Sequence, residues 1–123
     1  MKKQYRVKSE KDFQTAFQGG QSVANRQLVL YAYPKPEQVH FRVGFSVGKK
    51  MGNAVQRNLI KRRLRQAVHE LSTALDPQFD YLVIARFDIC NKNYAQIKKS
   101  LIHVMNLASV IDKNHIEGLS SKQ

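Results

Sequence analysis

Residues 48–71 read GKKMGNAVQRNLIKRRLRQAVHEL and combine a helical period of apolar side chains with a dense run of positive charge. After the expected N-cap Asn53, apolar residues recur at the i, i+4, i+7, i+8 and i+11 spacing of a helix that buries one face. These residues are Ile60, Leu64, Ala67, Val68 and Leu71. The spacing predicts a helix from residue 54 to residue 71 that packs on a hydrophobic core.

The flank beside this apolar face is cationic, and no neighbouring acid balances it. No Asp or Glu occurs between Glu37 and Glu70, whereas that interval contains Arg42, Lys49, Lys50, Arg57, Lys61, Arg62, Arg63 and Arg65. A solvated helix face is the simplest alternative, but such faces usually mix both signs, because like charges at i, i+4 cost a few tenths of a kcal/mol per pair. An external polyanion explains this pattern better, and nucleic acid is the favoured partner.

Length and composition indicate one basic globular domain with anionic partners. Of the 123 residues, 42% are hydrophobic. The chain has 21 Lys and Arg and 9 Asp and Glu, which gives a net charge of +12. We expect residues 1–112 to form a single RNA-binding domain and residues 113–123 to be a polar, disordered tail. The lone Cys90 and four scattered histidines exclude an internal disulfide and a structural zinc site, so no metal ligands are predicted. No apolar run reaches the length of a membrane span, and we expect a cytoplasmic protein without a membrane partner.

The segments around the basic helix predict an α+β fold with the element order α-β-β-α-β-α. Ser9 is expected to cap a helix over residues 10–18, which Gly19 and Gly20 end, and Asn93 to open a last helix. Residues 26–33 and 39–47 read as two strands joined by a short link, which favours an antiparallel pair with Val39 on its apolar face. Residues 81–85 read as a buried strand, so the basic helix lies in a βαβ unit.

The chemistry of the chain favours binding over protein-borne catalysis. No nucleophile–base pattern or metal-protease motif occurs, and Asp80 and Asp88 are expected to be solvated strand-end acids. The glycine-flanked segment before the basic helix lacks the nucleotide-triphosphate loop pattern but weakly favours a phosphate near Lys49, Lys50 and Asn53. Three aromatic residues could accept unstacked bases, although residue type alone favours a core role for the two in the first helix; they are Phe13, Phe17 and Tyr31.

Several motifs in order resemble the protein subunit of bacterial ribonuclease P. They are the Lys8–Phe17 helix start, SVANRQLVLY at 22–31, RVGFSVGKKMGNAV at 42–55, the arginine-rich segment 57–65 and the strand 81–86. The resemblance implies a small mixed four-stranded sheet with helices packed on it, like domain 2 of ribosomal protein S5, with a left-handed βαβ crossover. General chirality rules would instead favour a right-handed one.

The resemblance also implies a function. The protein would bind the ribonuclease P RNA subunit and the single-stranded 5′ leader of precursor tRNA, raising substrate affinity, while the RNA makes the endonucleolytic cut with Mg²⁺ held mainly by RNA. By motif position, Phe13, Phe17 and Tyr31 match the leader cleft. The matching residues of the RNA-facing helix are Arg57, Asn58, Lys61, Arg62 and Arg65.

One position departs from the pattern, and two other functions remain open. Leu59 stands where the family's segment has arginine, and its place on the helical wheel predicts an exposed side chain. Arg63, on the same side and one turn away, is the candidate replacement for that arginine. A ribosomal or assembly protein without a role in processing would have the same composition. A nuclease that acts without an RNA subunit is the second alternative.

Overall fold

The computed structural model describes residues 5–7 and 9–112, and the predicted tail at 113–123 lies outside them. Three helices and four strands form the fold: α1 (Glu10–Gly19), β1 (Gln21–Ala24), β2 (Leu28–Pro34), β3 (Arg42–Ser46), α2 (Ala54–Leu71), β4 (Phe79–Ala85) and α3 (Tyr94–Leu107). Short 3-10 helices are η2 (Lys49–Met51), η3 (Ser72–Ala74) and η4 (Phe87–Asn91). The α+β prediction is confirmed, and within the described ranges no helix is long and apolar enough to cross a membrane.

The sheet is mixed and has the strand order β1-β2-β4-β3. β2 pairs antiparallel with β1 and β4, whereas β3 pairs parallel with β4, so β3-α2-β4 is the predicted βαβ unit. The predicted antiparallel pair of β2 and β3 is wrong, because β4 lies between them. The physical reason is that Tyr81, Leu82 and Val83 are buried on both faces and therefore take a central position. The link after β2 passes over the start of β4, where the Lys35 N–H donates to the Gln78 carbonyl at 2.7 Å.

Two further strand predictions need correction. β3 begins at Arg42 instead of residue 39, and Val39 is 96% exposed instead of lying on the apolar face. The predicted element order α-β-β-α-β-α does not include β1. It is a four-residue edge strand whose Gln21–Ala24 side chains are mostly exposed, so it carries little hydrophobic signal.

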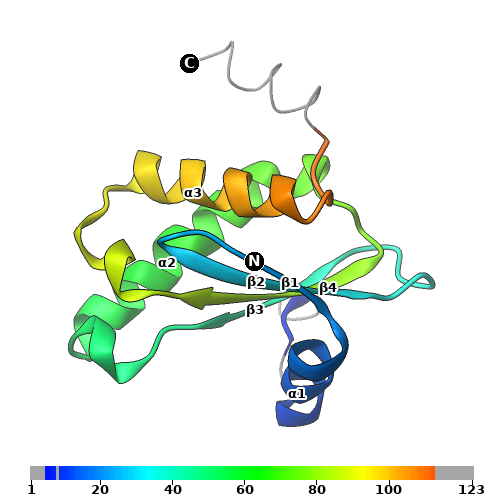
Figure 1. Cartoon of the computed structure of the whole chain (residues 1–123), viewed down its shortest axis with the longest axis horizontal. Coiled ribbons are helices and arrows are strands. Elements are labelled where there is room, and N and C mark those ends of the chain that lie inside the picture. Colours follow the sequence, from blue (N-terminus) through cyan, green and yellow to red (C-terminus); the bar gives the residue numbers. More distant parts are fainter. Residues whose placement is uncertain (1–4, 8, 113–123) are drawn as a thin grey trace.

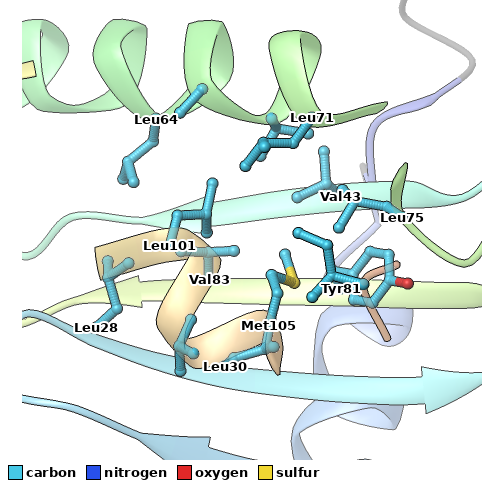
Figure 2. Packing of buried hydrophobic residues seen from close by; sticks show 14 of the residues in the cluster. Leu28, Leu30, Val43, Leu64, Leu71, Leu75, Tyr81, Val83, Leu101 and Met105 are labelled. Carbon is cyan, nitrogen blue, oxygen red and sulfur yellow. The ribbon is translucent and has the colours of Figure 1, made fainter. Parts of the chain in front are cut away.

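The two faces of the sheet are covered unequally (Figure 1). α2 and α3 lie together on one side, and α1 lies on the other. The core fills the layer between α2, α3 and the sheet, and Figure 2 shows Leu64 and Leu71 of α2 together with Leu101 of α3 and the strand residues Val43 and Val83. The predicted apolar arc of α2 is confirmed, since the helix buries Ile60, Leu64, Ala67, Val68 and Leu71. On α3 the buried apolar residues are Ile97, Leu101, Val104 and Met105.

The register decides which strand residues point away from the core. Leu28, Leu30 and Ala32 of β2 are buried against the helices, so the alternate residues of the strand point to the side that carries α1. We call this side the α1 face. Pairing across the sheet adds residues of the other strands, and the α1 face comprises Ser22, Ala24, Val29, Tyr31, Tyr33, Arg42, Gly44, Ser46, Asp80, Leu82 and Ile84.

Candidate nucleic-acid interface

The basic helix α2 starts from a fixed N-terminus. The Asn53 side chain accepts from the Gln56 N–H at 2.9 Å, and the Gln56 side chain accepts from the Asn53 N–H at 2.9 Å, which completes a capping box and confirms the predicted cap. Gly52 has φ 125°, and a Cβ there would lie 2.0 Å from Oε1 of Gln56. Only glycine fits this turn into the helix. The cap therefore occupies the Asn53 side-chain oxygen, and its amide nitrogen remains available to donate.

The cations beside the buried face of α2 have no acidic partner among the described residues. We call this set the α2 ridge: Arg57, Lys61, Arg62 and Arg65, with Asn58 between them. The described ion pairs involve other cations, namely Lys35, Arg42, Lys92 and Lys98. Arg62 and Asn58 are exposed, and the other three side chains are half-buried. The aliphatic parts of the half-buried side chains therefore pack against the protein, and the uncompensated charge of the ridge faces solvent.

Arg57 lies closest to the core. Its Nε atom is buried without a hydrogen-bond partner, while the residue as a whole is half-buried. A buried donor without a partner is unfavourable, typically by about 1–3 kcal/mol. An acceptor supplied from outside the chain would satisfy this donor.

Leu59 and Arg63 lie on the other side of the ridge. Leu59 is half-buried, not exposed as predicted, and lines a shallow surface groove with Val55, Asn58, Arg62 and Arg65. The Arg63 guanidinium donates to the Lys92 carbonyl at 3.3 Å, so it is turned toward the segment before α3. One guanidinium nitrogen of Arg63 is therefore engaged within the fold, and its replacement of an arginine at position 59 stays a prediction.

Arg42 is the exception within the basic stretch. Its guanidinium donates to Asp80 from two nitrogens, at 3.0 and 2.5 Å, and lies 3.4 Å from Asp12 of α1. These contacts, led by the bond to Asp80, raise the pKa of Arg42 above its ordinary value. The expectation that nothing local neutralises Arg42 is thus wrong. So is the expectation that Asp80 is solvated, because Asp80 is 2% exposed and a buried carboxylate requires a charged partner.

The loop before α2 displays two more predicted residues. Lys49 and Lys50 lie in η2 and are exposed, next to the exposed cap Asn53. Within the described ranges neither lysine forms an ion pair. The loop thus extends the uncompensated charge of the ridge around the N-terminus of α2.

The three predicted aromatic residues meet on the α1 face. Phe17 of α1 is 53% exposed, and its ring lies 4.8 Å from the ring of Tyr31 on β2. Phe13 is half-buried one turn earlier, over Gly44 of β3, where an added Cβ would lie 2.6 Å from its Cζ. We call Phe13, Phe17 and Tyr31 the aromatic surface. Ala16, rather than either phenylalanine, is the buried residue of α1.

The register also separates the two strand tyrosines. Tyr33 lies beneath the end of α1, where a Cβ on Gly19 would approach its ring to 2.9 Å, and Lys35 Nζ is 5.7 Å from its ring centre. Tyr31 is therefore the tyrosine beside Phe17. The contribution of Gly44 was not predicted. A glycine inside a strand is a signal of close approach by another group, and here it makes room for Phe13.

Comparison with known proteins decides the family. The sequence profile of the family described as Ribonuclease P matches residues 1–109. The chain belongs to the ribonuclease P protein family. The ribonuclease P protein component of Ligilactobacillus salivarius is 55% identical over 111 residues, which cover 90% of this chain and 98% of the relative. That of Enterococcus faecalis is 50% identical over 112 residues, or 91% and 95% of the two chains.

Solved structures of ribonuclease P proteins share the fold. The Staphylococcus aureus protein superposes with a TM-score of 0.82 at 44% identity, covering 88% of this chain and 98% of that one. The Thermotoga maritima protein, at 24% identity, has a TM-score of 0.75 over 81% and 94% of the two chains, and this likeness concerns the fold alone. The predicted resemblance is confirmed.

Family membership settles the general function. The chain is a protein component of ribonuclease P, the endoribonuclease that processes the 5′ ends of precursor tRNA. As such a component it is an RNA-binding subunit of a ribonucleoprotein whose partner is ribonuclease P RNA. The alternative of a ribosomal or assembly protein without a role in processing is therefore set aside.

Proposed function

We propose that the aromatic surface binds the single-stranded 5′ leader of precursor tRNA. The observation that carries this proposal is Phe17, a large aromatic side chain that remains 53% exposed although its ring packs beside Tyr31. An exposed aromatic ring on a fixed helix gives little to the core but offers a flat face on which an unstacked base can stack. Stacking tolerates any base, which suits leaders of differing sequence.

The α2 ridge, in this proposal, binds the phosphates of ribonuclease P RNA and of the substrate near the site of cleavage. Its cations have no acidic partner within the described residues, and the unpartnered Nε of Arg57 gains an acceptor when a phosphate arrives. Lys49, Lys50 and the amide of Asn53 extend the same contact around the N-terminus of α2. The protein thereby raises substrate affinity, and the RNA subunit carries catalysis.

In this proposal, RNA and not the protein coordinates the Mg²⁺ ions. Within residues 5–7 and 9–112, no three His, Cys, Asp or Glu residues are grouped as metal ligands, and Asp12 and Asp80 are both engaged by Arg42. The protein residues therefore do not fit a magnesium site of their own. Phosphate oxygens of the RNA subunit and the substrate would hold the ions. We place the assembled particle in the cytoplasm, with its precursor tRNA substrate.

Reconstitution tests whether the protein raises substrate affinity while the RNA subunit carries catalysis. The protein, the RNA subunit and a leader-bearing precursor tRNA are combined at low magnesium, where we expect protein-dependent 5′ cleavage. Cleavage by the protein without the RNA subunit would contradict the proposal and favour the independent nuclease.

The aromatic surface is tested by Phe17→Ala. We expect a loss of about 1–3 kcal/mol in affinity for leader-bearing substrate, because one stacked base is lost, with little change for leaderless tRNA. Binding of the two substrates to the reconstituted holoenzyme is measured side by side. An equal loss for both substrates would assign Phe17 to structure instead.

The ridge is tested by salt dependence. Each phosphate neutralised on single-stranded RNA contributes about −0.7 to the slope of log K against log salt. Alanine at Arg57, Lys61, Arg62 or Arg65 should reduce that slope, whereas Lys99→Ala, an exposed cation on α3, serves as the charge-matched control. An unchanged slope removes the residue from the phosphate-contacting set.

A further inference from the structure

The segment that precedes α1 lies along the edge of the sheet, and we call residues 5–7 the strap. Arg6 forms a parallel bridge with Val43 of β3, and the Val7 N–H donates to the Val43 carbonyl at 3.1 Å. In the strand order of the sheet β3 is an edge strand, so the strap pairs with part of its otherwise free edge. The strap therefore adds a further short segment to the sheet beyond β3.

Val7 brings the strap next to Phe13. Val7 is 6% exposed, and together with Ala16 of α1 and Leu82 of β4 it is buried outside the main core. A Cβ added to Gly44 would lie 2.6 Å from Cζ of Phe13 and 3.3 Å from Cβ of Val7. The two side chains thus flank the same point on the α1 face. Because the packing is close there, Val7 limits how far the Phe13 ring can move on that side.

Tyr5 anchors the strap through an aromatic stack. Its ring centroid lies 3.6 Å from that of His40, at an interplanar angle of 20°. The His40 ring in turn lies 4.4 Å from the ring of Phe41, which is 3% exposed and belongs to the main core. The His40 Nδ1 atom is 2.6 Å from the Phe41 carbonyl, and since a carbonyl only accepts, Nδ1 carries the proton and donates. His40 is therefore a fixed platform for the Tyr5 ring.

The stack is important because the strap is short. A three-residue segment gains little from backbone pairing alone, so the side chains at its two ends contribute much of what keeps it docked. Tyr5 is the aromatic anchor at one end, and Val7 is the apolar anchor at the other. An aromatic pair stabilises beyond the area that it buries. Without the stack, the strap would leave β3 for part of the time.

We propose that Tyr5 and His40 are positioning residues for leader binding, because their stack holds the strap and the strap holds Phe13 within the aromatic surface. Neither residue has to touch the RNA. This inference rests on the proposed leader binding by the aromatic surface and adds the contacts that keep this surface in its binding geometry. When the strap leaves β3, Phe13 loses its neighbour Val7, and leader affinity falls with the fraction of molecules whose strap remains docked.

Binding by the reconstituted holoenzyme tests the role, with Tyr5→Ala, Tyr5→Phe, His40→Ala and the control Val39→Ala. Val39 directly precedes His40 and is 96% exposed, so its substitution changes the same link but not the stack. We expect Tyr5→Ala and His40→Ala each to weaken binding of leader-bearing precursor tRNA about two- to tenfold, the range of an aromatic pair, and to leave leaderless tRNA unchanged. Tyr5→Phe keeps the ring and should retain the affinity, as should Val39→Ala.

Amide hydrogen exchange at Val7 gives a readout without RNA. The Val7 N–H is bonded to Val43, so its exchange should be slow in the wild-type protein, faster in Tyr5→Ala and slow again in Tyr5→Phe and Val39→Ala. Unchanged exchange in Tyr5→Ala would overturn the anchoring role. Thermal unfolding checks that each variant keeps the fold, and since Tyr5 and His40 are the two sides of one stack, either variant tests the contact if the other unfolds.

The binding results separate this inference from the proposed function. A leader-dependent loss in Phe17→Ala without one in Tyr5→Ala would overturn the positioning role and leave leader binding intact. An equal loss for leader-bearing and leaderless substrates, or a loss matched by Val39→Ala, would also overturn the positioning role. No leader-dependent loss in either Phe17→Ala or Tyr5→Ala would overturn both.

Discussion

The two faces of the sheet differ in how completely they are buried. On the face toward α2 and α3, Leu28 and Leu30 are fully buried, and the core closes over them. On the α1 face, Val29 and Tyr31 of the same strand are only half-buried, because α1 is short and covers part of the sheet. Stability therefore resides mainly on one face, and the other face is left accessible for a ligand.

The cations divide into those paired within the fold and those without an acidic partner. Arg42 joins α1 to the sheet through Asp12 and Asp80 and is thereby neutralised within the fold. The cations of the α2 ridge have no such acid among the described residues. Sign alone therefore does not identify an RNA-binding residue, and the distinction depends on whether the fold supplies a partner.

The largest expected effect contrasts neighbouring residues of β2. Leu30→Ala should lower the free energy of unfolding by about 2–5 kcal/mol, since it opens a cavity in the core. Val29→Ala, on the half-buried face, should cost about 1 kcal/mol. Chemical denaturation of both variants measures the difference, and equal losses would mean that the two faces contribute alike to stability.

A smaller effect is expected at Gly44. Gly44→Ala places a Cβ 2.6 Å from Cζ of Phe13, so Phe13 must shift, at about 1–3 kcal/mol in stability and with weaker binding of leader-bearing substrate. Gly48→Ala is the matched control, because an added Cβ there meets nothing within 4 Å. Thermal unfolding and the ratio of affinities for leader-bearing and leaderless tRNA check this prediction. Unchanged values in the Gly44 variant would show that Phe13 is not held by this contact.

The smallest effect concerns the ion pair between Glu70 of α2 and Lys98 of α3. The Tyr94 hydroxyl, which donates at 2.7 Å, and Lys98 at 3.0 Å lower the pKa of Glu70. A lowered pKa adds stability above the ordinary carboxyl range, and this stability is lost as pH falls through the folded-state pKa. Glu70→Gln should therefore cost less than about 1 kcal/mol at neutral pH, because the Glu70 side chain is 37% exposed, and the cost should vanish in acid. Denaturation at several pH values tests this, and a cost that persists in acid would point to lost packing.

Prediction from sequence succeeded where local periodicity carries the information. The buried stripes of α2 and α3, and the caps at Ser9, Asn53 and Asn93, follow from residue spacing and side-chain chemistry within one turn. The pairing of strands failed, because β4 inserts between β2 and β3 through contacts distant in the chain. The short strand β1 was missed since four mostly exposed residues give no clear period.

The candidate site shows the same limit. The identity of the aromatic and basic residues could be predicted, but the neutralisation of Arg42 by Asp80, 38 positions away, and the stack of Tyr5 on His40 could not. Both depend on which segments lie beside β3.

By itself, the sequence determined the helices, their buried faces and the excess of positive charge, because each depends on residues within a few positions of one another. Only the tertiary structure decided which cations remain unpaired, which tyrosine lies beside Phe17 and which residues support Phe13. These properties are set by strand order and register, which arise from the burial of β4 by elements far apart in the chain.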